Sequence, residues 1–85
     1  MIAQQVREFI IRNFYVSAPD QLADTDSLLD GGIIDSTGVL EVIGFIEDTF
    51  GFTVADAEML PENLDSIAHI AAFIERKTAG RGTPA

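Results

Sequence analysis

The chain contains no cysteine, a single histidine and no apolar run long enough to span a membrane. Without cysteine, neither a disulfide framework nor a thiolate metal site is available. The lone His69 excludes a multi-histidine metal centre within one chain. The missing apolar run excludes membrane insertion, and the N-terminus lacks the apolar core of a signal peptide. We therefore expect a soluble, cytoplasmic protein.

Basic residues are scarce. Five Lys and Arg face fourteen Asp and Glu, which gives a formal net charge of −9. All the acids except Glu8 and Glu75 lie between Asp20 and Asp65, a stretch without any Lys or Arg. Nucleic acid binding is not expected, because no basic stripe exists to displace phosphate counterions. The acidic surface either steers basic partners or only keeps the protein soluble.

Apolar residues make up 47% of the chain and recur at helical spacing. The main helices are predicted in three segments: residues 2–14, residues 36–50, and a segment from a cap at Asp65 or Ser66 to about Lys77. Residues 56–60 are expected to form a single short turn that Pro61 stops. We predict an all-α fold, a small four-helix bundle in which the third helix is short.

Residues 16–35 form a long loop rich in turn-forming Pro, Gly, Asp and Ser. Its apolar residues are expected to pin it across the helices as an ordered crossover: Leu22, Leu28, Leu29, Ile33 and Ile34. The acids of the loop fit a calcium-binding loop starting at Asp24 poorly, because Leu29 stands where that loop requires glycine. We expect one domain over residues 1–78, a flexible tail over 79–85, and a monomer.

Residues 32–38, Gly-Ile-Ile-Asp-Ser-Thr-Gly, place a serine at the start of the second predicted helix. Taken alone, Asp35 and Ser36 indicate an ordinary helix N-cap. A catalytic Ser36 would need a base and a Gly-x-Ser-x-Gly turn, but Ile34 occupies the first glycine position and His69 is a poor candidate base. We therefore do not expect an autonomous enzyme.

A phosphodiester on Ser36 is the alternative. The start of a helix offers unpaired N–H groups and the positive end of the helix dipole. The outward residues of the helix that follows are acids together with Leu40, which suits docking by a basic partner with a small apolar pocket. A scaffold without catalytic groups, a tethered phosphate and a docking helix together indicate a carrier.

The segment Leu28–Gly51, with Asp-Ser before an apolar helix, resembles the acyl carrier and peptidyl carrier proteins. The resemblance implies that Ser36, in an attachment motif with Asp35, bears 4′-phosphopantetheine, whose thiol holds an acyl or aminoacyl group as a thioester. The implied partners are a phosphopantetheinyl transferase, an acyl- or aminoacyl-loading ligase, and a downstream acyltransferase or synthase with basic patches. The candidate partner-binding residues are Thr37, Leu40, Glu41, Gly44, Glu47 and Asp48.

Three residues depart from the usual pattern of this family. Thr37 stands where leucine is usual, Gly38 stands where the fatty-acid carriers commonly have an acid, and Gly44 stands where a larger apolar residue is usual. Three functions remain open: a carrier in fatty acid biosynthesis or lipid metabolism, a specialised aminoacyl or D-alanyl carrier, and an acidic interaction module in which Ser36 is only a helix cap.

Overall fold

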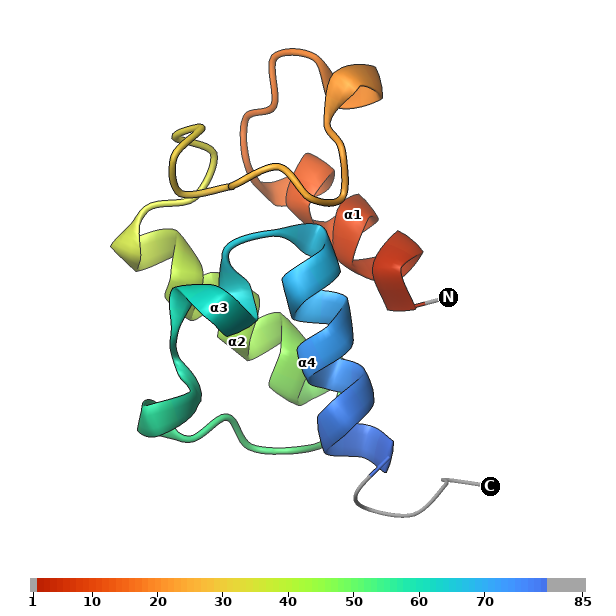
Figure 1. Ribbon diagram of the computed structural model, residues 1–85, viewed down its shortest axis with the longest axis vertical. Coiled ribbons are helices and arrows are strands. Elements are labelled where there is room, and N and C mark those ends of the chain that lie inside the picture. Colours follow the sequence, from red (N-terminus) through yellow and green to blue (C-terminus); the bar gives the residue numbers. More distant parts are fainter. Residues whose placement is uncertain (1, 80–85) are drawn as a thin grey trace.

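The computed structural model describes residues 2–79. This part of the chain contains α-helices and 3₁₀ turns and no strand, which confirms the all-α prediction (Figure 1). The α-helices are α1 (Ile2–Asn13), α2 (Ser36–Phe50), α3 (Pro61–Leu64) and α4 (Ile67–Ala79). The 3₁₀ turns are Pro19–Gln21 and Asp56–Glu58. None of the described helices is both long and apolar enough to cross a membrane.

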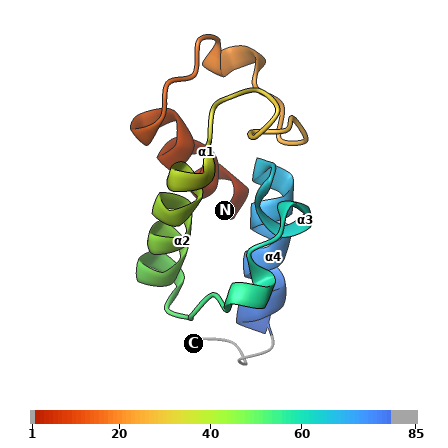
Figure 2. The ribbon, with the colours of Figure 1, turned by 90° about the vertical axis from the view of Figure 1, so that its left-hand side faces the viewer.

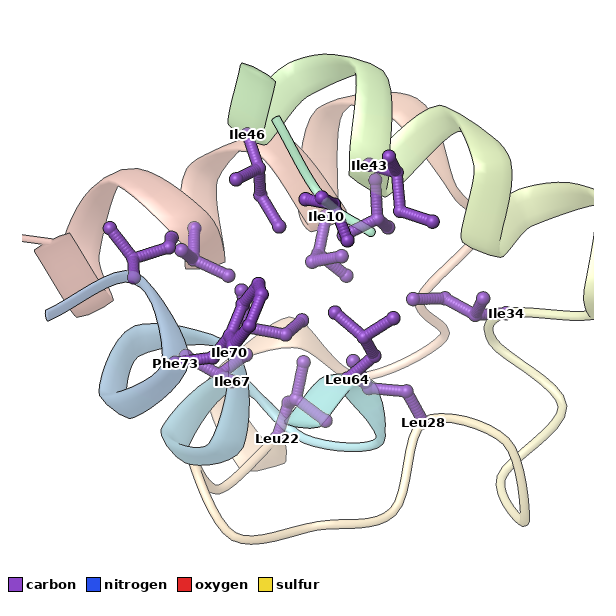
Figure 3. Close-up of a cluster of buried hydrophobic side chains, with 14 residues drawn as sticks. Ile10, Leu22, Leu28, Ile34, Ile43, Ile46, Leu64, Ile67, Ile70 and Phe73 are labelled. Atoms are coloured by element: carbon purple, nitrogen blue, oxygen red, sulfur yellow. The ribbon is translucent and has the colours of Figure 1, made fainter. Parts of the chain in front are cut away.

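The helices enclose one apolar core, in which α4 packs against α1, α2 and α3. The core side chains on the helices are Val6, Ile10, Val42, Ile43, Ile46, Leu64, Ile67, Ile70, Phe73 and Ile74. The long loop adds Leu22, Leu28 and Ile34, all buried, which confirms that it is an ordered crossover (Figure 3). Leu29 was expected to pin the loop but is 37% exposed, so the prediction was wrong for this residue.

Glycine and proline mark the end of α2 and the start of α3. Gly51 terminates α2 in the left-handed region at φ 76°, which favours glycine, and its N–H donates to the Glu47 carbonyl. The single turn predicted over residues 56–60 is present as the 3₁₀ turn Asp56–Glu58, but Pro61, which was expected only to stop it, begins α3. At the first position of a helix the missing proline N–H costs nothing and the fixed φ is already helical.

The structure also defines both ends of α4, which the sequence pattern left open. The Ser66 hydroxyl accepts the backbone N–H of His69 at 3.0 Å, so Ser66 is the cap of α4. The helix continues past Lys77 to Ala79, and the Thr78 hydroxyl donates to the Ile74 carbonyl at 2.8 Å. The expected tail therefore loses Ala79 to the helix, and its remainder, 80–85, lies outside the described residues.

The Asp65 carboxylate holds the long loop against the start of α4. Its oxygens accept the Ser27 hydroxyl at 2.8 Å and the Leu29 N–H at 3.0 Å. The Asp65 carbonyl in turn accepts the Leu28 N–H at 2.6 Å. The sequence pattern predicts Asp65 only as a possible helix cap, whereas its contact with Ser27 joins residues 38 positions apart in the chain. The contacts fix the loop that leads into α2.

An ion pair closes the opposite end of the bundle. The Glu58 carboxylate accepts Lys77 Nζ at 2.8 Å and the Ala55 N–H at 3.0 Å. These interactions, the Lys77 hydrogen bond foremost, hold the pKa of Glu58 below its ordinary value. Glu58 therefore stabilises the fold above its ordinary pKa, and this stabilisation disappears as the pH falls through the lowered pKa of the folded state.

We expect Glu58→Gln to lower stability at neutral pH and to match the wild type in acid. Urea unfolding at a series of pH values measures the difference between the two proteins. Glu62→Gln is the matched control, because Glu62 is exposed and its carboxylate has no hydrogen bond or ion pair within residues 2–79. A pH-independent difference for Glu58→Gln would show that the lost ion pair is not the cause.

Candidate functional site

The start of α2 is built by Asp35. This residue has extended backbone angles, φ −107° and ψ −174°, and its Oδ1 accepts the Gly38 N–H at 2.7 Å. Asp35 is therefore the N-cap, and Ser36 is the first residue of the helix. The hypothesis that Ser36 is itself the cap is wrong, because Ser36 already lies inside the helix and the Asp35 carboxylate accepts the Gly38 N–H.

The Ser36 side chain is exposed to solvent. Its hydroxyl makes no hydrogen bond within the described residues, and neither its own N–H nor that of Thr37 has a partner there. These N–H groups lie at the positive end of a 15-residue helix. A phosphate attached at this point would meet free hydrogen-bond donors and a favourable dipole.

Gly38 joins the start of α2 to the end of α1. It is buried, and a Cβ atom added to it would lie 2.8 Å from Phe14 Cε1 and 3.2 Å from Ile34 Cγ2. The glycine at this position thus has a packing reason, because a larger residue would require the Phe14 ring to move. The contact between Gly38 and Phe14 seats the turn that carries Ser36 against α1.

Comparison with protein-family models matches residues 4–74 to the family described as "Phosphopantetheine attachment site". The chain belongs to this family. It is accordingly a member of the acyl and peptidyl carrier proteins, and its prosthetic group is covalent 4′-phosphopantetheine. A D-alanyl carrier protein from Abiotrophia defectiva is 32% identical over 53 residues, which cover 62% of this chain and 67% of that protein.

The outward face of α2 in this carrier combines two acids, Glu41 and Asp48, with uncharged residues. Thr37, Glu41 and Asp48 are exposed, and Leu40 is 62% exposed. No atom lies within 4 Å of a Cβ built on Gly44, so packing inside the described residues does not require glycine at this position. The fold therefore leaves the surface around Gly44 open to close approach from outside.

Glu47 differs from the other residues in the predicted partner-binding set. It is half-buried, and its Oε2 accepts the Val54 N–H at 2.8 Å. The side chain therefore holds the connector after α2, a task that its helical position alone did not indicate. A substitution at Glu47 would disturb this connector, so Glu41 and Asp48 are the cleaner residues for tests of docking.

Two acids of the long loop, Asp24 and Asp26, hold the fold together. Asp24 pairs with Arg7, and Asp26 Oδ2 accepts the Ala23 N–H at 2.9 Å. In the part of the chain that the structure describes, no three His, Asp or Glu side chains are grouped so as to hold a metal ion.

Proposed function

We propose that this carrier bears 4′-phosphopantetheine on Ser36 and presents an acyl or aminoacyl group to partner enzymes. The observation that carries the proposal is that Asp35 caps α2 and leaves the adjacent Ser36 hydroxyl exposed and without a hydrogen bond. A transferase can therefore reach this oxygen without dismantling the helix start. The unpaired N–H groups of Ser36 and Thr37 would then face the new phosphodiester.

The attachment reaction uses one group of this chain, the Ser36 hydroxyl. The Ser36 oxygen forms an ester with the pantetheine-bearing phosphorus of coenzyme A, and the phosphoanhydride bond breaks to release adenosine 3′,5′-bisphosphate. The hydroxyl proton passes to a base of the transferase. When bound, the group supplies a terminal thiol that carries the cargo as a thioester.

The chain itself supplies position rather than catalysis. His69, the only histidine, lies exposed on α4, and its Nδ1 is 2.9 Å from the Ser66 hydroxyl. This contact belongs to the cap of α4 and leaves Ser36 without a base from this residue. We therefore assign the acyl-transfer steps to the partner enzymes.

The absence of cysteine makes the attachment easy to count. After incubation with coenzyme A, Mg²⁺ and a broad-specificity phosphopantetheinyl transferase, the desalted protein should gain one titratable thiol per chain. The unmodified chain has none, since it contains no cysteine. An acidic interaction module without a prosthetic group would remain free of thiol.

The cargo that we propose is an amino acid of the D-alanyl type. Two observations favour it over a fatty acyl group: the relative described above is a D-alanyl carrier protein, and Gly-Ile-Ile-Asp-Ser is more typical of discrete specialised carriers. A ligase that activates D-alanine with ATP should then load the modified protein, whereas a fatty acyl ligase should not. Intact mass distinguishes the two cargoes.

Docking of that ligase should depend on the acidic face of α2. We expect Glu41→Lys to raise the KM for the carrier by roughly five- to tenfold with little change in kcat, because a favourable charge contact becomes a repulsive one. The wild-type KM should rise with salt, since exposed charges are screened. Glu75→Lys, an equal charge change on exposed α4, is the control. Equal effects of both variants would place the docking surface elsewhere.

A further inference from the structure

A hollow of about 300 Å³ lies between the end of α1 and the long loop. One wall is the segment that follows α1, and the other is the segment that leads into α2. The lining residues that matter here are Tyr15, Val16, Ser17, Ala18, Gln21 and Ile33. Both segments rise together at the same end of the molecule, next to the start of α2 (Figures 1 and 2).

Two observations place the hollow near Ser36. Ile33 lines it and precedes Ser36 by three residues, a span of at most about 10 Å. Phe14, the residue before Tyr15, also approaches Gly38 in the first turn of α2. A flexible chain longer than this span, attached at Ser36, would therefore reach the hollow.

The lining has both polar and apolar groups. The side chains of Ser17 and Gln21 are exposed and make no hydrogen bond within residues 2–79. Val16 and Ile33 are half-buried and add apolar surface. Tyr15 is 83% exposed and has no ring contact in the described part of the chain. An open aromatic face and unused polar groups are what a ligand of mixed polarity requires.

We propose that the hollow receives the prosthetic arm. The inference rests on the attachment at Ser36 proposed above. The arm combines two amides and a hydroxyl with methylene and dimethyl groups, which matches the unused polar groups of Ser17 and Gln21 beside Val16 and Ile33. An arm held here lies against the long loop and leaves the outward face of α2 clear for partner enzymes.

The test compares the apo and modified proteins by ¹⁵N–¹H correlation NMR, after intact mass has shown full modification. We expect amide shifts at Ser17, Ala18 and Gln21, which are remote from Ser36 in sequence. Tyr15 gives a second signal: it is the only tyrosine in a chain without tryptophan, so its emission should also change on modification. No comparable shifts are expected across α3.

Two variants separate arm binding from a general effect of modification. Ala18→Phe fills the hollow and should abolish the remote shifts and the emission change, although the protein is still modified. Ala72→Phe places the same ring on the exposed face of α4 and should leave both signals as in the wild type. Modification without remote shifts, or shifts on the α3 side instead, overturns the inference but not the attachment. A protein that cannot be modified overturns both.

Discussion

Replacing Asp65 with alanine should lower the free energy of unfolding by about 2–3 kcal/mol. The substitution removes the carboxylate that accepts the Ser27 hydroxyl and the Leu29 N–H, and it leaves the half-buried Ser27 hydroxyl without that acceptor. Hydrogen bonds to a charged group are worth more than neutral ones, and a group left without a partner adds its desolvation cost. Urea unfolding measures the change.

A double-mutant cycle shows whether the clamp between Ser27 and Asp65 is responsible. If it is, Ser27→Ala should cost far less in the Asp65→Ala background than in the wild type, with a coupling of about 1 kcal/mol or more. Asp20→Ala is the charge-matched control, because Asp20 is exposed and its carboxylate has no contact within the described residues. An equal loss from Asp20→Ala would mean that general charge, and not the clamp, sets the stability.

Leucine at Gly38 and leucine at Gly44 should have opposite effects. Gly38→Leu should destabilise the fold by about 1–3 kcal/mol, because its Cβ already overlaps the Phe14 ring at 2.8 Å. Gly44→Leu should stabilise it by roughly 0.5–1 kcal/mol, because a helix-forming residue replaces glycine where nothing lies within 4 Å. The two variants place the same residue in the same helix, Gly38 in its first turn and Gly44 in its interior.

Phe14→Ala should relieve part of the cost of Gly38→Leu, since it removes the ring that the new side chain meets. Unfolding of the two single variants and the double variant measures this relief. If Gly38→Leu were as stable as Gly44→Leu, the close contact between Phe14 and the start of α2 would not exist in solution.

The helical plan was predictable because apolar residues recur at helical spacing and the boundaries carry strong local signals. Gly51 ends α2 and the Asp-Ser pair marks its start, as the sequence indicated. The error at Pro61 shows the limit of such signals, because proline is compatible with both a stop and a first helical position. Local sequence does not choose between them.

The contacts that seat the site depend on residues far apart in the chain. Asp65 clamps Ser27 across 38 residues, and Phe14 explains why position 38 is glycine. Sequence periodicity does not encode such pairs. The sequence also did not show which of Asp35 and Ser36 caps α2, because both residue types are favoured at a cap. The backbone angles and the Gly38 hydrogen bond identify Asp35 as the cap.

The direct test of the central claim is the intact mass of the wild type and of Ser36→Ala after incubation with coenzyme A and a phosphopantetheinyl transferase. We expect the wild type to gain one phosphopantetheine and Ser36→Ala to gain none. Ser17→Ala, at another exposed serine, should be modified fully. Because Asp35 keeps the cap, Ser36→Ala should unfold at the same urea concentration as the wild type. Modification of Ser36→Ala, or none of the wild type, would contradict the assignment.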